Sequence, residues 1–186
     1  MASILVVCTG NICRSPIAEG MIRAAFARTP GNGAVEVSSA GTNGWEGSEA
    51  MPESVRAASE RGVDISQHVG RRLSGEMLDA ADLVVCMAQE HREIIEADRP
   101  DIMDRTFTLK ELVRLLEDLP GPSPNLQARV KEADDLRRDG FDGNPFDEDI
   151  ADPLGLPIDT YRAVAWELEA WCERLAAGLA AADGGG

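Results

Sequence analysis

Two cysteines, an arginine and a serine lie close together near the start of the chain, where an apolar run gives way to a helix-like pattern. The stretch from Val6 to Gly20 reads VVCTGNICRSPIAEG. A cysteine thiolate is a strong nucleophile, and an arginine can hold two oxygens of a phosphate group at once. Cys8, Arg14 and Ser15 together therefore predict nucleophilic transfer of a phosphoryl group.

The segments on either side predict how these residues are positioned. Ile4–Val7 is aliphatic throughout, as in a strand buried on both faces, and a proline suits the first turn of the helix that follows. A loop between a strand and a helix directs backbone N–H groups at an anion. Gly10 relieves steric limits in such a loop, and Asn11 tolerates a left-handed conformation. The same field, with the Ser15 hydroxyl, favours the thiolate form of Cys8.

A thiolate of this kind needs a proton donor for the leaving group and later a base for water. Asp152, in the stretch IADPLGLP, is the carboxyl group best suited to both roles. Pro153 and Pro157 stiffen this turn, and Gly155 allows it to bend tightly. The alternative is an Asp-Pro turn with no catalytic role.

Apolar segments of the strand type alternate with helical patterns along the chain. This order predicts an α/β fold with a four-stranded parallel sheet, helices on both faces and a phosphate-binding loop after the first strand. The expected strands are Ile4–Val7, AVEVSSAG, ADLVVCMA and RTFTL. The expected helices follow Pro16, run from Pro52 to about Arg61, cover QEHREIIEAD and KELVRLLEDL, and fill about Ile158 to Ala182.

The length of 186 residues suits one domain, residues 1–186. An acidic, Pro- and Gly-rich insertion at about 117–150 interrupts it, and the tail 183–186 is expected to be frayed. Between Glu117 and Asp152 lie eleven acidic and four basic residues, a net charge of −7. We expect a helix at LQARVKEADDLRR and otherwise an exposed, partly mobile spacer. Beside the pocket, its charge would disfavour acidic phosphopeptides.

The overall charge narrows the classes of partner. Acidic residues outnumber basic ones by 33 to 18, for a net charge of −15, which opposes general binding to nucleic acids or anionic membranes. The apolar start has no secretory signal features and no run is long enough for a membrane span, so we expect a cytoplasmic protein. His68 and His91 show no metal-ligand spacing; we expect the first to be structural, the second exposed, and no metal or cofactor.

Four segments carry a resemblance to a known family. VCTGNICRSPIAEG resembles the active-site loop of the low-molecular-weight protein tyrosine phosphatases, in their bacterial branch, and ADPLG resembles their acid-bearing loop. SSAGTNGW and ISQHVGRRL are also similar to segments of the family. The resemblance implies that Cys8 forms a phosphocysteine intermediate, steadied by Ser15. Arg14 and the loop amides then bind the phosphoryl oxygens, and Asp152 acts as acid and then base.

The resemblance also implies supporting roles and partners. Cys13 is similar to a second cysteine that can form a disulfide with Cys8, Ser39 supports the loop, and Trp45 forms an aromatic wall. Substrates are phosphorylated proteins, phosphate or other oxyanions bind in the loop, and no metal is required. The implied substrate-binding residues are Thr9, Gly10, Asn11, Ile12, Cys13, Trp45 and Leu154.

The substrate has two main candidates. Tyrosine-specific members usually carry aromatic residues after the Asp-Pro, where Leu154 and Gly155 stand here. Bacterial protein-arginine phosphatases resemble this chain at FTLKE and DPLGLPIDTYR, but carry a threonine where this chain has Ile12. An apolar lip suits a ring better than a guanidinium, so phosphotyrosine is the favoured substrate and phosphoarginine the alternative.

Two further classes of function are weaker alternatives. Thioredoxin-linked arsenate reductases share the fold, but need a relay of further cysteines. Cys86 lies in an expected buried strand and Cys172 on the last helix. Trp166 and Trp171, on the same helix, are expected to be core or helix-packing residues. A non-catalytic phosphoprotein-binding module would keep the anion site without Cys8 and an acid.

Overall fold

The sheet has four parallel strands in the order β2-β1-β3-β4. The computed structural model describes residues 1–28, 35–141 and 146–180. The strands are β1 (Ala2–Cys8), β2 (Val35–Gly41), β3 (Leu83–Cys86) and β4 (Thr106–Thr108). β1 is central and pairs with both β2 and β3, so that Ile4 lies opposite Val37 on one side and Leu83 on the other. The predicted four-stranded parallel sheet is confirmed.

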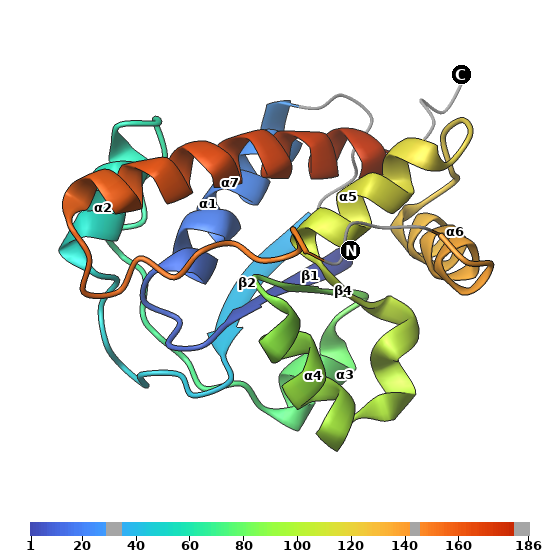
Figure 1. Cartoon of the computed structure of the whole chain (residues 1–186), viewed down its shortest axis with the longest axis horizontal. Coiled ribbons are helices and arrows are strands. Elements are labelled where there is room, and N and C mark those ends of the chain that lie inside the picture. Colours follow the sequence, from blue (N-terminus) through green and yellow to red (C-terminus); the bar gives the residue numbers. More distant parts are fainter. Residues whose placement is uncertain (29–34, 142–145, 181–186) are drawn as a thin grey trace.

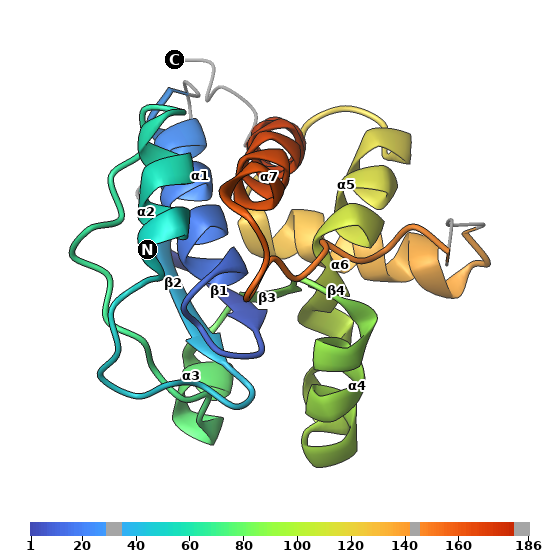
Figure 2. The same ribbon diagram turned by 60° about the vertical axis from the view of Figure 1, so that its left-hand side comes forward.

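Helices cover both faces of this sheet (Figure 1). On one face lie α1, α5 and α7, and on the other lie α3, α4 and the 3₁₀ helix η1, an arrangement that Figure 2 also shows. The helices are α1 (Arg14–Arg28), α2 (Pro52–Ser59), α3 (Gly75–Ala80), α4 (Gln89–Asp98), η1 (Pro100–Arg105), α5 (Leu109–Asp118), α6 (Leu126–Arg138) and α7 (Ile158–Leu179).

The central strand divides the core into two layers. Ile4 and Val6 belong to the larger apolar cluster with residues of α1, α5 and α7, whereas Leu5 and Val7 belong to the cluster with residues of α3, α4 and η1. Successive side chains of a strand point to opposite faces, so an unbroken aliphatic run feeds both layers. This double burial fixes β1 and therefore the position of Cys8 at its carboxyl end.

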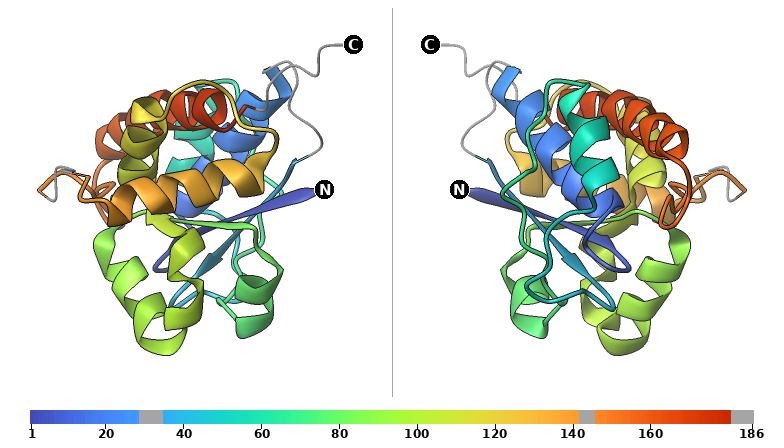
Figure 3. Two further views of the ribbon diagram at one scale, coloured as in Figure 1. Left: turned by 90° about the vertical axis from the view of Figure 1, so that its right-hand side faces the viewer. Right: turned by 90° about the vertical axis from the view of Figure 1, so that its left-hand side faces the viewer.

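The helix predicted at LQARVKEADDLRR, inside the acidic insertion, is confirmed as α6. Leu126, Val130 and Ala133 are buried in the larger cluster, and α6 packs against α5 and η1 (Figure 3). The Arg137 guanidinium donates hydrogen bonds to the main-chain oxygens of Thr106, at 3.0 Å, and of Met103, at 2.6 Å. The apolar stripe of α6 makes it a structural cover for the edge strand β4. Residues 142–145 of the insertion lie outside the described residues.

A few smaller expectations also need correction. The second helix ends at Ser59 rather than near Arg61, the last ends at Leu179, and α3 and η1 were not predicted. The predicted frayed tail 183–186 lies outside the described residues. Trp166 is 64% exposed rather than part of the core, whereas Trp171 is partly buried and packs under the Arg174 guanidinium. In the part of the chain that the structure describes, no helix is long and apolar enough to cross a membrane.

Candidate active site

A tight loop joins the carboxyl end of β1 to the start of α1. It runs from Cys8 to Arg14, and both of these side chains are almost fully buried. Asn11 has a φ of 57°, and it is the one non-glycine residue with positive φ in the described part of the chain. Asparagine tolerates this left-handed conformation, as its sequence position predicted. Gly10 has no positive φ; a Cβ there would lie 3.2 Å from Ile12 Cγ1, so its small size serves packing instead.

The Cys8 sulfur lies among hydrogen-bond donors. The main-chain N–H of Asn11 donates to Sγ at 3.3 Å, and Ser15 Oγ lies 2.9 Å from Sγ. Ser15 Oγ also accepts a hydrogen bond from Asn11 Nδ2 at 2.8 Å, which leaves its own proton free to point at the sulfur. Donors aimed at a sulfur stabilise its anionic form, so the site suits a Cys8 thiolate.

Asn11 connects this loop to two other segments, through its side chain and its main-chain carbonyl. Its Nδ2 donates to Ser39 Oγ at 2.8 Å, and its Oδ1 accepts from the main-chain N–H of Arg71 at 2.8 Å. His68 Nε2 lies 2.8 Å from the Asn11 carbonyl oxygen; because a carbonyl only accepts, this nitrogen carries the proton. His68 is therefore the hydrogen-bonded structural residue that the sequence predicted.

Two glycines let neighbouring segments of main chain pack closely against the loop that carries Cys8 and against Trp45. A Cβ at Gly41 would clash with the Thr9 carbonyl oxygen, and one at Gly70 would clash with the Trp45 carbonyl oxygen. The main-chain N–H of Trp45 then donates to the Gly10 oxygen at 3.0 Å. The absence of side chains here places Trp45 at the rim of the loop.

The Arg14 guanidinium is held from three directions. Nη1 donates to the Ile150 carbonyl oxygen at 3.1 Å, and Nη2 lies 3.3 Å from Thr9 Oγ1 and 3.0 Å from Asp152 Oδ2. The ion pair with Asp152 is half-exposed on the carboxylate side. The Asp152 carboxylate and a bound phosphoryl group are both anions, so they would compete for the Arg14 guanidinium.

Asp152 is held by the segment that precedes it. The Ile150 N–H donates to the Met87 oxygen at 2.7 Å, and the Leu154 N–H donates to Asp152 Oδ1 at 3.1 Å. Gly155 has a φ of 77°, and it allows the turn that the sequence predicted after the Asp-Pro. The acid therefore lies against the nucleophile's loop although it is far away in sequence.

Farther upstream, an ion-pair clamp attaches the same segment to α5. Asp147 pairs with Lys110 Nζ and with Arg114 Nη2, each at 2.8 Å, and the hydrogen bond from Lys110 holds the pKa of Asp147 below its usual value. Lys110 also pairs with Glu167 on α7 at 2.7 Å. This clamp was not predicted, because its partners are distant in sequence.

A small cavity of about 60 Å³ opens between the loop and Asp152. Trp45 and Leu154 are about half-exposed at its rim, and Ile12 is buried in its wall. Nine residues line it: Cys8, Thr9, Gly10, Ile12, Cys13, Arg14, Trp45, Asp152 and Leu154. The structure thus brings together all the predicted site residues except Asn11 and Ser15, which support the sulfur from behind.

The remaining cysteines, Cys13, Cys86 and Cys172, are buried free thiols. Burial raises the pKa of Cys13 to about 11, and its sulfur lies 4.0 Å from the Tyr161 hydroxyl. Cys86 and Cys172 are fully buried, which raises the pKa of each; that of Cys86 rises to about 12. Neither has the accessible thiolate that a reductase relay requires.

One functional candidate was missed. His91 was expected to be exposed, but it lies fully buried under the loop, with Nε2 2.9 Å from Thr9 Oγ1. Charged residues surround His91 in the sequence, so the local composition does not indicate that it is buried. The only indication is its position in the first helical turn after β3.

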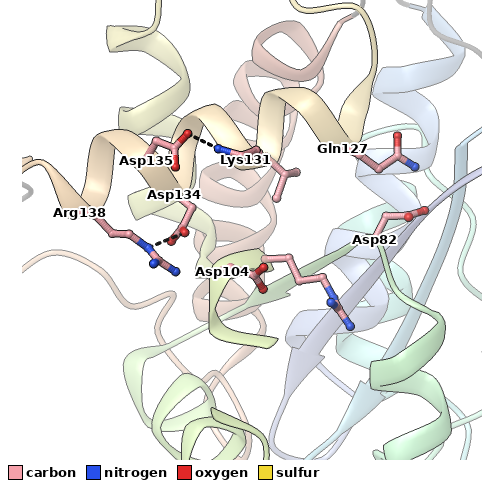
Figure 4. Close-up of a pocket in the computed structure, with 9 residues that line it drawn as sticks. Asp82, Asp104, Gln127, Lys131, Asp134, Asp135 and Arg138 are labelled. Atoms are coloured by element: carbon pink, nitrogen blue, oxygen red, sulfur yellow. Dashed lines mark hydrogen bonds and ion pairs between the residues drawn. The ribbon is translucent and has the colours of Figure 1, made fainter. Parts of the chain in front are cut away.

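A larger cavity of about 420 Å³ lies at the other end of the sheet, beside α6 (Figure 4). Two ion pairs lie within its lining, Lys131 with Asp135 at 2.6 Å and Arg138 with Asp134 at 2.7 Å. Its lining has no cysteine, serine or threonine, so the cysteine chemistry that the sequence predicts belongs to the smaller cavity.

Comparisons with known proteins give several matches over most of the chain. A family model described as low molecular weight phosphotyrosine protein phosphatase matches residues 3–132. A protein-arginine-phosphatase of Geobacillus stearothermophilus is 37% identical over 93% of both chains. The low molecular weight protein-tyrosine-phosphatase Etp of Escherichia coli (strain K12) is 39% identical over 64% of this chain and 76% of its own. A crystal structure of a YwlE mutant from Bacillus subtilis superposes with a TM-score of 0.73 at 32% identity, covering 95% of this chain and 97% of that one.

Proposed function

Because the chain belongs to the low molecular weight phosphotyrosine protein phosphatase family, a family of cysteine-dependent enzymes, we propose that it hydrolyses phosphotyrosine in proteins through a phosphocysteine at Cys8. The observation that carries the proposal is the single small cavity that Cys8, Arg14 and Asp152 share. A nucleophile, an anion clamp and an acid in one site are what the two half-reactions require.

In the first step, the Cys8 thiolate attacks the phosphorus atom. The sulfur–phosphorus bond forms as the bond from phosphorus to the tyrosine oxygen breaks. Asp152 gives its proton to that oxygen, and Arg14 with the loop N–H groups binds the charge on the other oxygens. The Ser15 hydroxyl, 2.9 Å from the sulfur, stabilises the thiolate before attack.

In the second step, water replaces the sulfur. Asp152, now a carboxylate, takes a proton from the water as its oxygen bonds to phosphorus. The sulfur–phosphorus bond breaks, inorganic phosphate leaves, and the Cys8 thiolate is restored. One carboxyl group serves both steps because it alternates between its two protonation states.

Three apolar side chains support an aromatic substrate. Ile12 lies buried in the cavity wall, and Trp45 and Leu154 stand half-exposed at the rim. A phenyl ring buries apolar area against such side chains and can stack on an indole.

Phosphoarginine is the second candidate, and one observation favours it. The relative that matches 93% of both chains is a protein-arginine-phosphatase, whereas the tyrosine phosphatase Etp matches 64% of this chain. Against phosphoarginine, a guanidinium carries several N–H donors, and the Ile12 side chain offers them no acceptor.

Matched phosphotyrosine and phosphoarginine peptides test the proposal. We expect faster phosphate release from phosphotyrosine, a loss of at least about a thousandfold with Cys8→Ser, and a loss of about 10²–10⁴-fold with Asp152→Asn. Ile12→Thr should move the preference toward phosphoarginine by about tenfold. Faster turnover of phosphoarginine by the native chain would replace phosphotyrosine as the substrate. No turnover of either peptide would overturn the proposed activity.

We also place the enzyme in the reducing environment of the cytoplasm. Support comes from the four cysteines, all free thiols, and from the requirement that Cys8 be reduced in order to attack phosphorus.

A further inference from the structure

His91 lies buried beneath the phosphate-binding loop, in the first turn of α4. It has no exposed surface, although its side chain is polar. A buried imidazole must be hydrogen-bonded or carry a cost in stability. The partners of its two ring nitrogens therefore indicate what it does.

One ring nitrogen reaches the loop. Nε2 lies 2.9 Å from Thr9 Oγ1 and 3.3 Å from the carboxylate of the largely exposed Glu90. The other nitrogen, Nδ1, is buried with no hydrogen-bond partner. An unpaired buried polar atom costs about 1–3 kcal/mol, so an imidazole held here for packing alone would be a poor solution. The contact with Thr9 is the gain that offsets this cost.

Thr9 passes the contact on to Arg14. The Thr9 hydroxyl oxygen accepts a hydrogen bond from Arg14 Nη2 at 3.3 Å while it contacts His91. A threonine hydroxyl shared by two partners has one rotamer that satisfies both. His91, Thr9 and Arg14 therefore form a continuous chain of contacts from α4 to the phosphate clamp.

This chain matters most when a substrate arrives. Of the three groups on Arg14, Asp152 is the one that a phosphoryl anion would displace. The Ile150 oxygen and the Thr9 hydroxyl then remain to hold the guanidinium in its plane. A neutral imidazole suits this place, because a second cation would repel Arg14. Burial and the Arg14 charge lower the pKa of His91 to about 4, against the opposing effect of Asp149 and Asp152.

We propose that His91 is a positioning residue of this phosphatase: by fixing the Thr9 hydroxyl, it fixes the orientation in which Arg14 holds the phosphoryl oxygens. The inference rests on the proposed function of the same site. It assigns no proton transfer to His91, which touches neither the sulfur nor the substrate.

Variants of His91 separate this role from packing. The amide of a glutamine reaches about as far as histidine Nε2, whereas that of an asparagine reaches only about as far as Nδ1. We expect His91→Leu and His91→Asn to lower kcat/KM for para-nitrophenyl phosphate by about 10–100-fold and to weaken binding of inorganic phosphate similarly. His91→Gln should restore both to within about threefold of the native values. Glu96→Gln, at an exposed position of the same helix, is the control and is expected to change neither.

A double-mutant cycle with Thr9→Val tests the route. If His91 acts through the Thr9 hydroxyl, His91→Leu should cost less than about twofold more in the Thr9→Val background. The proposal is overturned if His91→Gln is as impaired as His91→Leu at equal thermal stability, or if the two losses simply multiply. Should the leucine variant fail to fold, the comparison of glutamine with asparagine decides.

The phosphate-binding measurement keeps the two proposals apart. A native chain that binds inorganic phosphate but hydrolyses no phosphate ester contradicts the proposed function, while the dissociation constants of the variants still judge His91. A native chain that does not bind phosphate overturns both.

Discussion

The surroundings of the Cys8 sulfur depend on Asn11. Its backbone accepts the left-handed conformation that closes the loop, and its main-chain N–H donates to the Cys8 sulfur. Its amide bridges Ser15 and Ser39, so the orientation of the Ser15 proton is set from outside the loop. A single short amide thus couples backbone conformation to the electrostatics of the thiolate.

His91 gives a pH dependence of stability. Its pKa is near 6.5 in an unfolded chain and about 4 in the fold, so the unfolded state binds the extra proton between these values. The free energy of unfolding therefore falls as the pH drops from about 7 to 4, by about 3 kcal/mol from this residue. Urea denaturation of the native chain and of His91→Gln at pH 7 and pH 4.5 measures it. The native chain should lose more stability than the variant; equal losses would contradict the buried, neutral assignment.

At the scale of elements, the segment before Asp152 behaves as an arm attached to α5. Asp147→Asn removes the carboxylate that pairs with Lys110 and Arg114. The position of Asp152 should then be less firmly fixed. Protonation of the leaving group matters most when that group is basic. We expect turnover of phenyl phosphate to fall by about threefold to tenfold, and turnover of para-nitrophenyl phosphate to change little.

Glu117→Gln is the matched control for this arm. It weakens an ion pair with Arg174 at the other end of α5, and both substrates should be unaffected. An equal loss for both substrates with Asp147→Asn would mean that the clamp acts on binding rather than on the acid.

The elements of the site differ in how much of them a sequence can predict. The loop from Cys8 to Arg14 is local, because a strand, a turn and a helix start follow one another, and its geometry was predicted correctly. Asp152 was also identified, since an Asp-Pro turn is a local pattern. The Asp147 clamp and the burial of His91 were not, because both depend on contacts between segments far apart in the chain.

At the scale of the whole molecule, α6 protects an open side of the sheet. Arg137 binds the carbonyl oxygens of Thr106 and Met103 and lies 4.1 Å over the Phe107 ring. Arg137→Met keeps the aliphatic stem but leaves these oxygens without their donor. We expect a loss of about 1–3 kcal/mol in the free energy of unfolding, measured in urea, and more self-association by light scattering.

Arg138→Met is the control on the same helix. Arg138 is largely exposed, and its buried partner Asp134 keeps its ion pair with Arg137 at 2.6 Å, so the loss of Arg138 should cost less than about 1 kcal/mol. A similar loss in the free energy of unfolding for both variants would mean that the carbonyl oxygens bound by Arg137 do not explain its effect on stability.

The overall architecture follows from the order of apolar segments, and its parallel sheet was predicted for that reason. The role of α6 was not, because charge and Pro-Gly content dominate the composition of the segment and conceal the three apolar side chains that α6 buries. Composition describes the average of a segment, whereas packing depends on one stripe of it.

The Arg14–Ile150 hydrogen bond joins the beginning of the chain to its last third. During synthesis on a ribosome, Cys8 emerges before Asp152, which emerges only after α6. A nascent chain that has exposed Cys8 therefore lacks its acid until α5 and α6 have been made. The proposed site is therefore complete only once the chain up to Asp152 has been made, and cleavage between Cys8 and Asp152 would separate the two side chains into different fragments.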